Sequence, residues 1–290
     1  MINDHALEVV SRLSDDREQA TSFGLVADRY DRVRPGPPAP ALDWLVPAGC
    51  QVAVDLAAGT GLFTRALLGR VPRVIAVEPD PRMREVLARR SPGLDVRGGR
   101  GEAMPLPDAS ADAVFVSTAW HWLDLPRAVP EIARVLRPGG RLGVIWTSRN
   151  RDEDWVAELD LLRPGGGTRG PADSVRAYLD RHHTVNLPDG APFGAAETAS
   201  FRFSRTMPVA DVIDWLATSS HVITASATDR EAALAGCLAV LLGRAVGQPG
   251  AAEPVIEMPM RSWCWRADRS PAAPGGDTAA GRLTSGSGNN

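Results

Sequence analysis

The chain has 290 residues, of which 44% are hydrophobic and 23% charged, and its formal net charge at pH 7 is −3. These proportions are typical of a globular protein that buries a core, and they exclude an intrinsically disordered chain. The pI near 6.0 argues against a protein that binds nucleic acid mainly through phosphate contacts. All 32 basic residues are arginines, which excludes mechanisms that need a Schiff-base or phosphate-cradling lysine.

The three cysteines, Cys50, Cys237 and Cys264, are far apart and form no disulfide or metal-binding pattern. The first residues lack the basic region and apolar run of a secretory signal. No stretch approaches the roughly 20 apolar residues of a membrane span. We therefore expect a cytoplasmic protein that binds neither nucleic acid nor a membrane; the oligomeric state is left open.

The first 48 residues are expected to form a helical lid. Helices are predicted at 6–13 and 20–30, and the proline-rich run at 34–40 ends the second, because proline lacks a backbone donor and restricts the residue before it. From residue 51 short apolar strands alternate with helices, which indicates a parallel sheet covered on both faces. The predicted strands are 51–56, 73–77, 94–97, 113–117 and 141–146, the last after a turn at 138–140, and the predicted helices are 61–70, 81–90 and 127–136.

This alternation stops after residue 150. The predicted helices that follow are 152–162, 171–182, 208–218 and 229–246, and the predicted strands are 198–206 and 255–265. We expect a ligand-binding core at 49–150, and a cap insertion with C-terminal strands at 151–267 that complete the same domain. The segment 268–290, rich in Gly, Ser, Pro and Ala, is expected to be a disordered tail.

The most informative stretch is 52–62, a strand that enters a glycine-bearing turn and then a helix. Gly59 and Gly61 let the backbone approach a ligand, and the helix N-terminus offers unpaired N–H groups. Glu78 ends the next strand, 17 residues after Gly61, where nucleotide-binding sheets place an acid on a ribose diol. A dinucleotide turn would have a third small residue where Thr64 stands, so a ligand without pyrophosphate is favoured. The alternatives are that Gly59 and Gly61 form an ordinary strand–helix turn and that Glu78 is a solvated glutamate at a strand end.

These residues resemble the class I S-adenosylmethionine-dependent methyltransferases. The motif of that family, an Asp followed by three spaced glycines, is matched by Asp55, by Ala57 in place of the first glycine, and by Gly59 and Gly61. The segments 74–83, 101–114 and 131–142 resemble later motifs in the same order. The resemblance implies a Rossmann-like α/β fold: a seven-stranded, mostly parallel sheet with helices on both faces, an antiparallel last strand and helical cap insertions.

The resemblance also implies S-adenosylmethionine as the methyl donor, S-adenosylhomocysteine as the product, and no metal. Glu78 would hold the ribose and Met83 would lie against the adenine. Arg100 stands where the family often has Asp, so backbone groups at 101 and 102 would bind the adenine. The expected cofactor-binding residues are Tyr30, Asp55, Ala57, Gly59, Thr60, Gly61, Glu78, Pro79, Met83, Gly101, Glu102, Thr118 and Ala119.

The loop at 119–124 leaves the fourth strand at the edge of the sheet where ligands bind. With 30–36, its Ala-Trp-His-Trp motif resembles a small-molecule branch that includes trans-aconitate-type methyltransferases. His121 is the candidate catalytic base, because a histidine titrates near neutral pH. Trp120, Trp122 and Arg34 are the candidate substrate residues. The alternatives are that Trp120 and Trp122 only pack against a helix, that His121 is hydrogen-bonded to the backbone, and that Arg34 is solvated at the surface.

The sequence therefore predicts an enzyme that transfers a methyl group to an oxygen or nitrogen atom of a small molecule. One alternative keeps the fold and the cofactor but catalyses another reaction, such as a cyclisation. The other is an NAD(P)-dependent oxidoreductase, which Thr64 and the later motifs disfavour.

Overall fold

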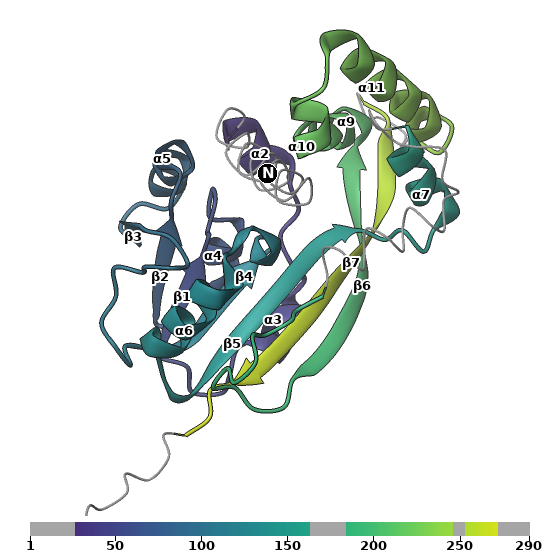
Figure 1. Cartoon of the computed structure of the whole chain (residues 1–290). Coiled ribbons are helices and arrows are strands. Elements are labelled where there is room, and N and C mark those ends of the chain that lie inside the picture. Colours follow the sequence, from purple (N-terminus) through teal and green to yellow (C-terminus); the bar gives the residue numbers. More distant parts are fainter. Residues whose placement is uncertain (1–26, 163–183, 246–252, 272–290) are drawn as a thin grey trace, which may run out of the picture.

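A computed structural model describes residues 27–162, 184–245 and 253–271 of the chain (Figure 1). The helices predicted at 6–13 and 171–182, and the tail beyond residue 271, lie outside the described residues. None of the helices in the described ranges is long and apolar enough to cross a membrane.

A seven-stranded sheet, in the order β3-β2-β1-β4-β5-β7-β6, forms the centre of the molecule. The strands β1 to β5 pair in parallel, whereas β7 runs antiparallel to both of its neighbours, β5 and β6. The strands are β1 (Val52–Leu56), β2 (Arg73–Glu78), β3 (Asp95–Gly98), β4 (Ala111–Ser117), β5 (Leu136–Arg149), β6 (Glu197–Pro208) and β7 (Val255–Asp268). The predicted α/β fold, with its antiparallel last strand, is confirmed.

Helices cover both faces of this sheet. The helix α6 and the short 3-10 helix η2 close one apolar cluster, and α3 and α4 close another cluster on the opposite face. The helices are α2 (Ala27–Val33), α3 (Ala39–Leu45), α4 (Leu62–Leu67), α5 (Pro81–Arg90), η2 (Trp120–Trp122), α6 (Leu125–Val135), α7 (Asp154–Leu161), α9 (Val209–Ala217), α10 (Ser220–Ile223) and α11 (Ala227–Leu242). The central strands are apolar because both of their faces are buried.

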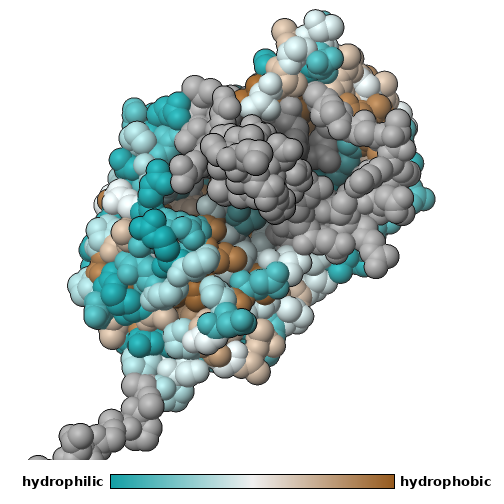
Figure 2. All heavy atoms as spheres, in the orientation of Figure 1, coloured by the Kyte–Doolittle hydropathy of each residue, from teal (hydrophilic) through white to brown (hydrophobic). Residues whose placement is uncertain are grey.

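The upper right of Figure 1 shows that β6 and β7 extend beyond the core and carry α7, α9, α10 and α11. These helices, which we call the cap, share an apolar cluster with the ends of β6 and β7. Helix α2 contacts both parts: its Ala27 packs on Met83 and Val86 of α5, and its Val33 joins the cap cluster. The surface over α5, at the left edge of Figure 2, is hydrophilic, as expected of a helix with many arginines.

Two local expectations were wrong. Helix α3 begins within the proline-rich run, which was expected only to end the helix before it; proline is compatible with the first helical turn, where the backbone N–H has no helical partner. The turn expected at 138–140 lies inside β5, which begins at Leu136. A shift of register between Ala111 and Ala113 of β4 accommodates the residues around Gly139, whose φ is 77°.

Candidate active site

The turn from β1 to α4 lies at the carboxyl ends of the parallel strands and has an uncommon backbone. Ala57, Gly59 and Gly61 have φ values of 58°, 57° and 86°, in the left-handed region that favours glycine. A Cβ atom on Gly61 would also come within 2.8 Å of Cγ of Leu87. A Cβ on Gly59 would meet no atom, so at Gly59 the backbone is open to a ligand.

Glu78, at the end of β2, is hydrogen-bonded to this turn. The backbone N–H of Gly59 donates to Oε2 of Glu78, and the N–H of Asp80 donates to Oε1, each at 2.8 Å. Glu78 is 6% exposed, and this burial raises the pKa of its carboxyl group. Each carboxylate oxygen can accept more than one hydrogen bond, so Glu78 can hold the turn and still receive hydroxyl groups from a ligand.

Two buried polar atoms at the turn have no hydrogen-bond partner among the described residues: Oδ1 of Asp55 and Oγ1 of Thr60. The other oxygen of Asp55 accepts a hydrogen bond of 2.5 Å from the hydroxyl of Thr64. Burial raises the pKa of Asp55 to about 7. Buried polar atoms are normally satisfied, so Oγ1 of Thr60, which borders the cavity described next, fits a site that receives a polar ligand.

The turn opens into a cavity that encloses about 580 Å³ of atom-free space, part of it open to solvent. Its walls come from the β1–α4 turn, the ends of β4 and β5, helix α2 with the loop behind it, and helix α9 of the cap. The lining residues are Tyr30, Arg34, Pro35, Gly36, Pro37, Ala57, Ala58, Gly59, Thr60, Leu62, Phe63, Ser117, Thr118, Thr147 and Trp215.

Part of the predicted cofactor-binding set therefore borders one cavity. These residues are Tyr30, Ala57, Gly59, Thr60 and Thr118, joined by Arg34 of the predicted substrate set. Thr118 follows β4 with a φ of 58°, and its N–H donates to the carbonyl of Ile145 at 2.7 Å. A left-handed, non-glycine residue beside a cavity is typical of functional sites, where strain persists because the surroundings hold it in place.

The remaining predicted residues lie outside this lining. Trp120 is 2% exposed within the apolar cluster of α6, and its indole N–H has no partner among the described residues. His121 is half-buried, with its ring centroid 4.4 Å from that of Trp122, and Met83 packs against Ala27. The other predicted residues outside the lining are Asp55, Gly61, Glu78, Pro79, Gly101, Glu102 and Ala119.

Trp215 is a wall residue that the sequence analysis missed. The guanidinium of Arg149 lies 5.3 Å from the centre of its ring. The backbone carbonyl of Trp215 accepts a hydrogen bond of 2.7 Å from the hydroxyl of Thr218. That hydroxyl in turn accepts a hydrogen bond of 3.2 Å from Nε of Arg34. The helix that carries Trp215 has an ordinary amphipathic pattern, so no sequence signal could have distinguished it from a core residue.

Ion pairs attach α2 to both sides of the cavity. Asp31, whose side chain is 7% exposed, pairs with Arg65 of α4 and, at 3.5 Å, with Arg90 of α5. On the cap side, Arg32 pairs with Asp214 of α9. Helix α2, which carries Tyr30, is therefore held against core and cap together.

Comparison with known proteins agrees with this fold. A family model described as a methyltransferase domain matches residues 54–144. An uncharacterised methyltransferase of Mycobacterium tuberculosis is 41% identical over 214 residues, which are 74% of this chain and 83% of that protein. The malonyl-[acyl-carrier protein] O-methyltransferase of Methylococcus capsulatus is 42% identical over 95 residues, 31% of this chain and 34% of that protein.

Among solved structures, a protein of Anaeromyxobacter dehalogenans, assigned provisionally as a type II methyltransferase, has the same fold, with a TM-score of 0.59 and 24% identity. The match covers 82% of this chain and 99% of that protein. The chain belongs to the methyltransferase family.

Proposed function

We propose that this protein transfers a methyl group from S-adenosylmethionine to an oxygen or nitrogen atom of a small molecule in the cytoplasm. The observation that carries the proposal is the left-handed turn at Ala57, Gly59 and Gly61, which is hydrogen-bonded to Glu78 and opens into the cavity. A buried acid beside an open backbone turn fits a ligand that carries a ribose diol.

The residues of the site would bind and orient the donor. Glu78 would accept hydrogen bonds from both ribose hydroxyls while it keeps the turn in place. The hydroxyl of Thr60, which has no partner among the described residues, borders the cavity and would bond to a polar group of the ligand. When bound, the donor supplies an electrophilic methyl group on a positively charged sulfur atom.

The acceptor would enter from the side of Arg34 and Trp215, which also line the cavity, while Tyr30 would contact the donor. Transfer of this kind depends mainly on holding donor and acceptor in line. We propose that His121 takes the proton of a hydroxyl or amine acceptor and that Trp122 lies near the acceptor; Trp120, buried in the core, would support this loop from behind. The name of the Methylococcus capsulatus relative favours oxygen as the methylated atom, although the matched segment is only a third of either chain.

Calorimetric titration with S-adenosylmethionine, S-adenosylhomocysteine and NAD⁺ tests the donor. We expect binding of the first two and none of the third. A screen of small acids, phenols and amines for release of S-adenosylhomocysteine then tests the reaction. Binding of NAD⁺ alone would contradict the proposal, and a product that lacks the transferred methyl group would favour another reaction on the same fold.

A further inference from the structure

The loop between β3 and β4, residues 99–110, begins beside the proposed donor site. Gly98, the last residue of β3, is paired with Glu78 of β2. A Cβ atom on Gly99 would come within 3.1 Å of Cγ1 of Val77 and within 2.6 Å of Cδ of Pro105. The loop thus folds back on itself at the same edge of the sheet as Glu78.

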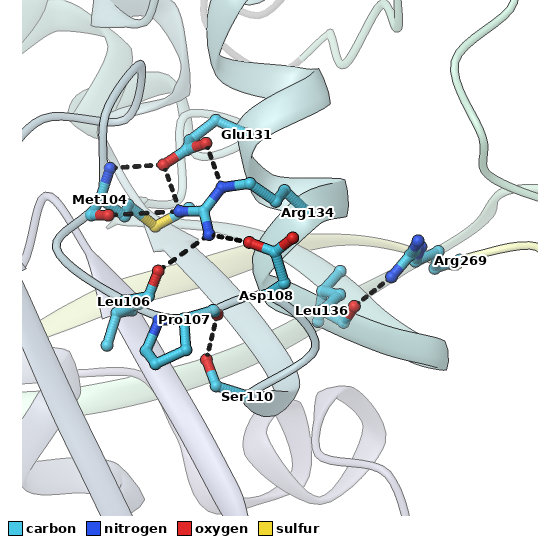
Figure 3. Close-up of polar contacts among 9 residues, drawn as sticks. All are labelled: Met104, Leu106, Pro107, Asp108, Ser110, Glu131, Arg134, Leu136 and Arg269. Atoms are coloured by element: carbon cyan, nitrogen blue, oxygen red, sulfur yellow. Dashed lines mark hydrogen bonds and ion pairs between the residues drawn. The ribbon is translucent and has the colours of Figure 1, made fainter.

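The backbone of this loop cannot bond as a strand or helix would, because Pro105 and Pro107 have no N–H group. Several of its polar groups are instead satisfied by α6, and the carbonyl of Pro105 accepts a hydrogen bond of 2.8 Å from Arg97 of β3. Figure 3 shows the guanidinium of Arg134 pointing into the loop, where NH1 donates to the carbonyl of Leu106 at 2.9 Å and NH2 to that of Met104 at 3.3 Å.

Arg134 also binds two carboxylates. Its Nε and NH2 donate to the two oxygens of Glu131, each at 2.7 Å, and NH1 donates to Oδ1 of Asp108 at 2.6 Å. All five N–H donors of the guanidinium are therefore used. Glu131 in turn accepts the N–H of Met104 at 2.7 Å, so the arginine and the glutamate together hold three backbone groups of the loop (Figure 3).

The start of the loop is attached to the other end of the same helix. Oε1 of Glu102 accepts the N–H of Asp124, the N-cap residue of α6, at 3.0 Å. A Cβ on Gly101 would meet Cδ2 of Leu123 at 2.8 Å, so the backbone there packs directly on this segment. Helix α6, with 11 residues and a length of about 16 Å, thus holds the loop at both ends.

We propose that Arg134 is a positioning residue for the purine end of the donor site: with Glu131 it fixes residues 104–108 and thereby sets the backbone at Gly101 and Glu102, which would bind the purine as the resemblance to methyltransferases implies. The inference rests on the proposed function, since it takes S-adenosylmethionine as the ligand. Lysine could replace this arginine only in part, because its three donors on one nitrogen cannot reach all the acceptors around the planar guanidinium.

The test compares Arg134→Met and Arg134→Lys with Arg127→Met, a matched control because Arg127 is exposed on the same helix. Calorimetry measures binding of S-adenosylhomocysteine and of its analogue with hypoxanthine in place of adenine. We expect wild type and control to prefer adenine, Arg134→Met to bind S-adenosylhomocysteine at least tenfold more weakly with most of that preference lost, and Arg134→Lys to be intermediate.

A second measurement, hydrogen exchange without ligand, separates positioning from general destabilisation. The amides of 101–108 should exchange at least tenfold faster in Arg134→Met, whereas those of β1 and β2 should exchange as in the wild type. Glu131→Gln, a smaller change, should show the same pattern more weakly. It replaces Arg134→Met in the test if that variant does not fold.

Three results would overturn the inference: a folded Arg134→Met with wild-type affinity, an equal loss of affinity for both purines, or a wild type that binds both purines equally. Failure of the wild type to bind S-adenosylhomocysteine would instead contradict the proposed function, so the two failures are distinguishable.

Discussion

At the scale of single residues, Glu78 has two roles in the proposed site: it fixes the glycine turn and accepts the ribose hydroxyls. Glu78→Gln removes the charge and one of the two acceptor oxygens. We expect donor affinity to fall by about 1.5–3 kcal/mol, the range for hydrogen bonds to a charged group, as measured by calorimetry. Glu85→Gln, on the exposed surface of α5, is the control and should bind normally. Wild-type affinity in a folded Glu78→Gln would remove the ribose assignment.

Asp55 makes stability depend on pH in an unusual direction. Its pKa is about 7 in the folded protein, because the carboxyl group is buried, against an ordinary 3.8. Between these values the folded state binds the extra proton, so the free energy of unfolding falls as pH rises from about 4 to 7 and then levels off. The loss is at most about 4 kcal/mol, since one pKa unit corresponds to about 1.4 kcal/mol.

Urea unfolding of the wild type and of Asp55→Asn at pH 5 and pH 7.5 measures this effect. The asparagine can still accept the hydroxyl of Thr64 but cannot ionise. We expect the stability of the wild type relative to the variant to decrease between the two pH values. A difference that is constant with pH would show that Asp55 does not titrate in this range.

His121 is the residue for which catalysis and packing predict different results. His121→Asn removes a group that accepts a proton near neutral pH. If His121 is the base, donor binding should be normal and turnover about 10²–10⁴-fold slower, with a smaller deficit for acceptors that are already ionised, such as carboxylates. A uniform loss across acceptors, together with a lower melting temperature, would assign His121 to packing against Trp122.

At the scale of elements, α2 depends on Asp31, which pairs with arginines of two core helices. Asp31→Asn leaves both arginines without this charge, and we expect a loss of about 1–3 kcal/mol in the docking of α2. Hydrogen exchange over 27–33 should be faster, and donor affinity lower, because α2 carries Tyr30. The control is Asp43→Asn, whose exposed pair with Arg70 should contribute little. Unchanged exchange over 27–33 would show that packing alone holds this helix.

Elements with strong local signals could be predicted from the sequence. Helix α5 has the predicted bounds because Asp80 caps it, accepting from the N–H of Arg82, and Pro81 suits its first turn. The strands with continuous apolar runs were predicted to within a few residues. Helix α3 was missed because its prolines, which suit a first turn, were interpreted as breakers.

The glycine turn of the candidate site and Glu78 lie within a short stretch of sequence, so their motif was recognisable. The opposite wall was not, because it depends on contacts across long separations. Arg34 contacts Thr218, 184 residues away, and Arg32 pairs with Asp214; together with the packing of α9, these contacts bring Trp215 to the cavity. No local pattern encodes such a contact between two segments that are distant in the sequence.

At the scale of the whole molecule, β7 passes through three apolar clusters. Met258 and Met260 belong to the apolar cluster of the cap, Cys264 to the cluster of α3 and α4, and Trp265 to that of α6. Because one strand is shared, we expect core and cap to unfold in a single transition.

Leu241→Ala tests this cooperativity. Leu241 is fully buried in the cap, so the change should cost about 2–4 kcal/mol and lower the one melting temperature seen by calorimetry. Leu238→Ala, on the same helix at 39% exposure, should cost less than about 1 kcal/mol. Two separate transitions in Leu241→Ala would show that the cap melts independently.

The position of β7 also determines when the protein can be completed during synthesis. The ribosome makes β6 before β7, yet in the sheet β7 lies between β5 and β6. A nascent chain that has reached residue 254 can pair its first five strands, but β6 has no partner until β7 emerges and inserts. The wall that carries Trp215 follows β6 in sequence and is anchored through it, so that wall is assembled last. The cavity wall would therefore form only after β7 has been synthesised, and until then one edge of β5 and both edges of β6 are unpaired and exposed.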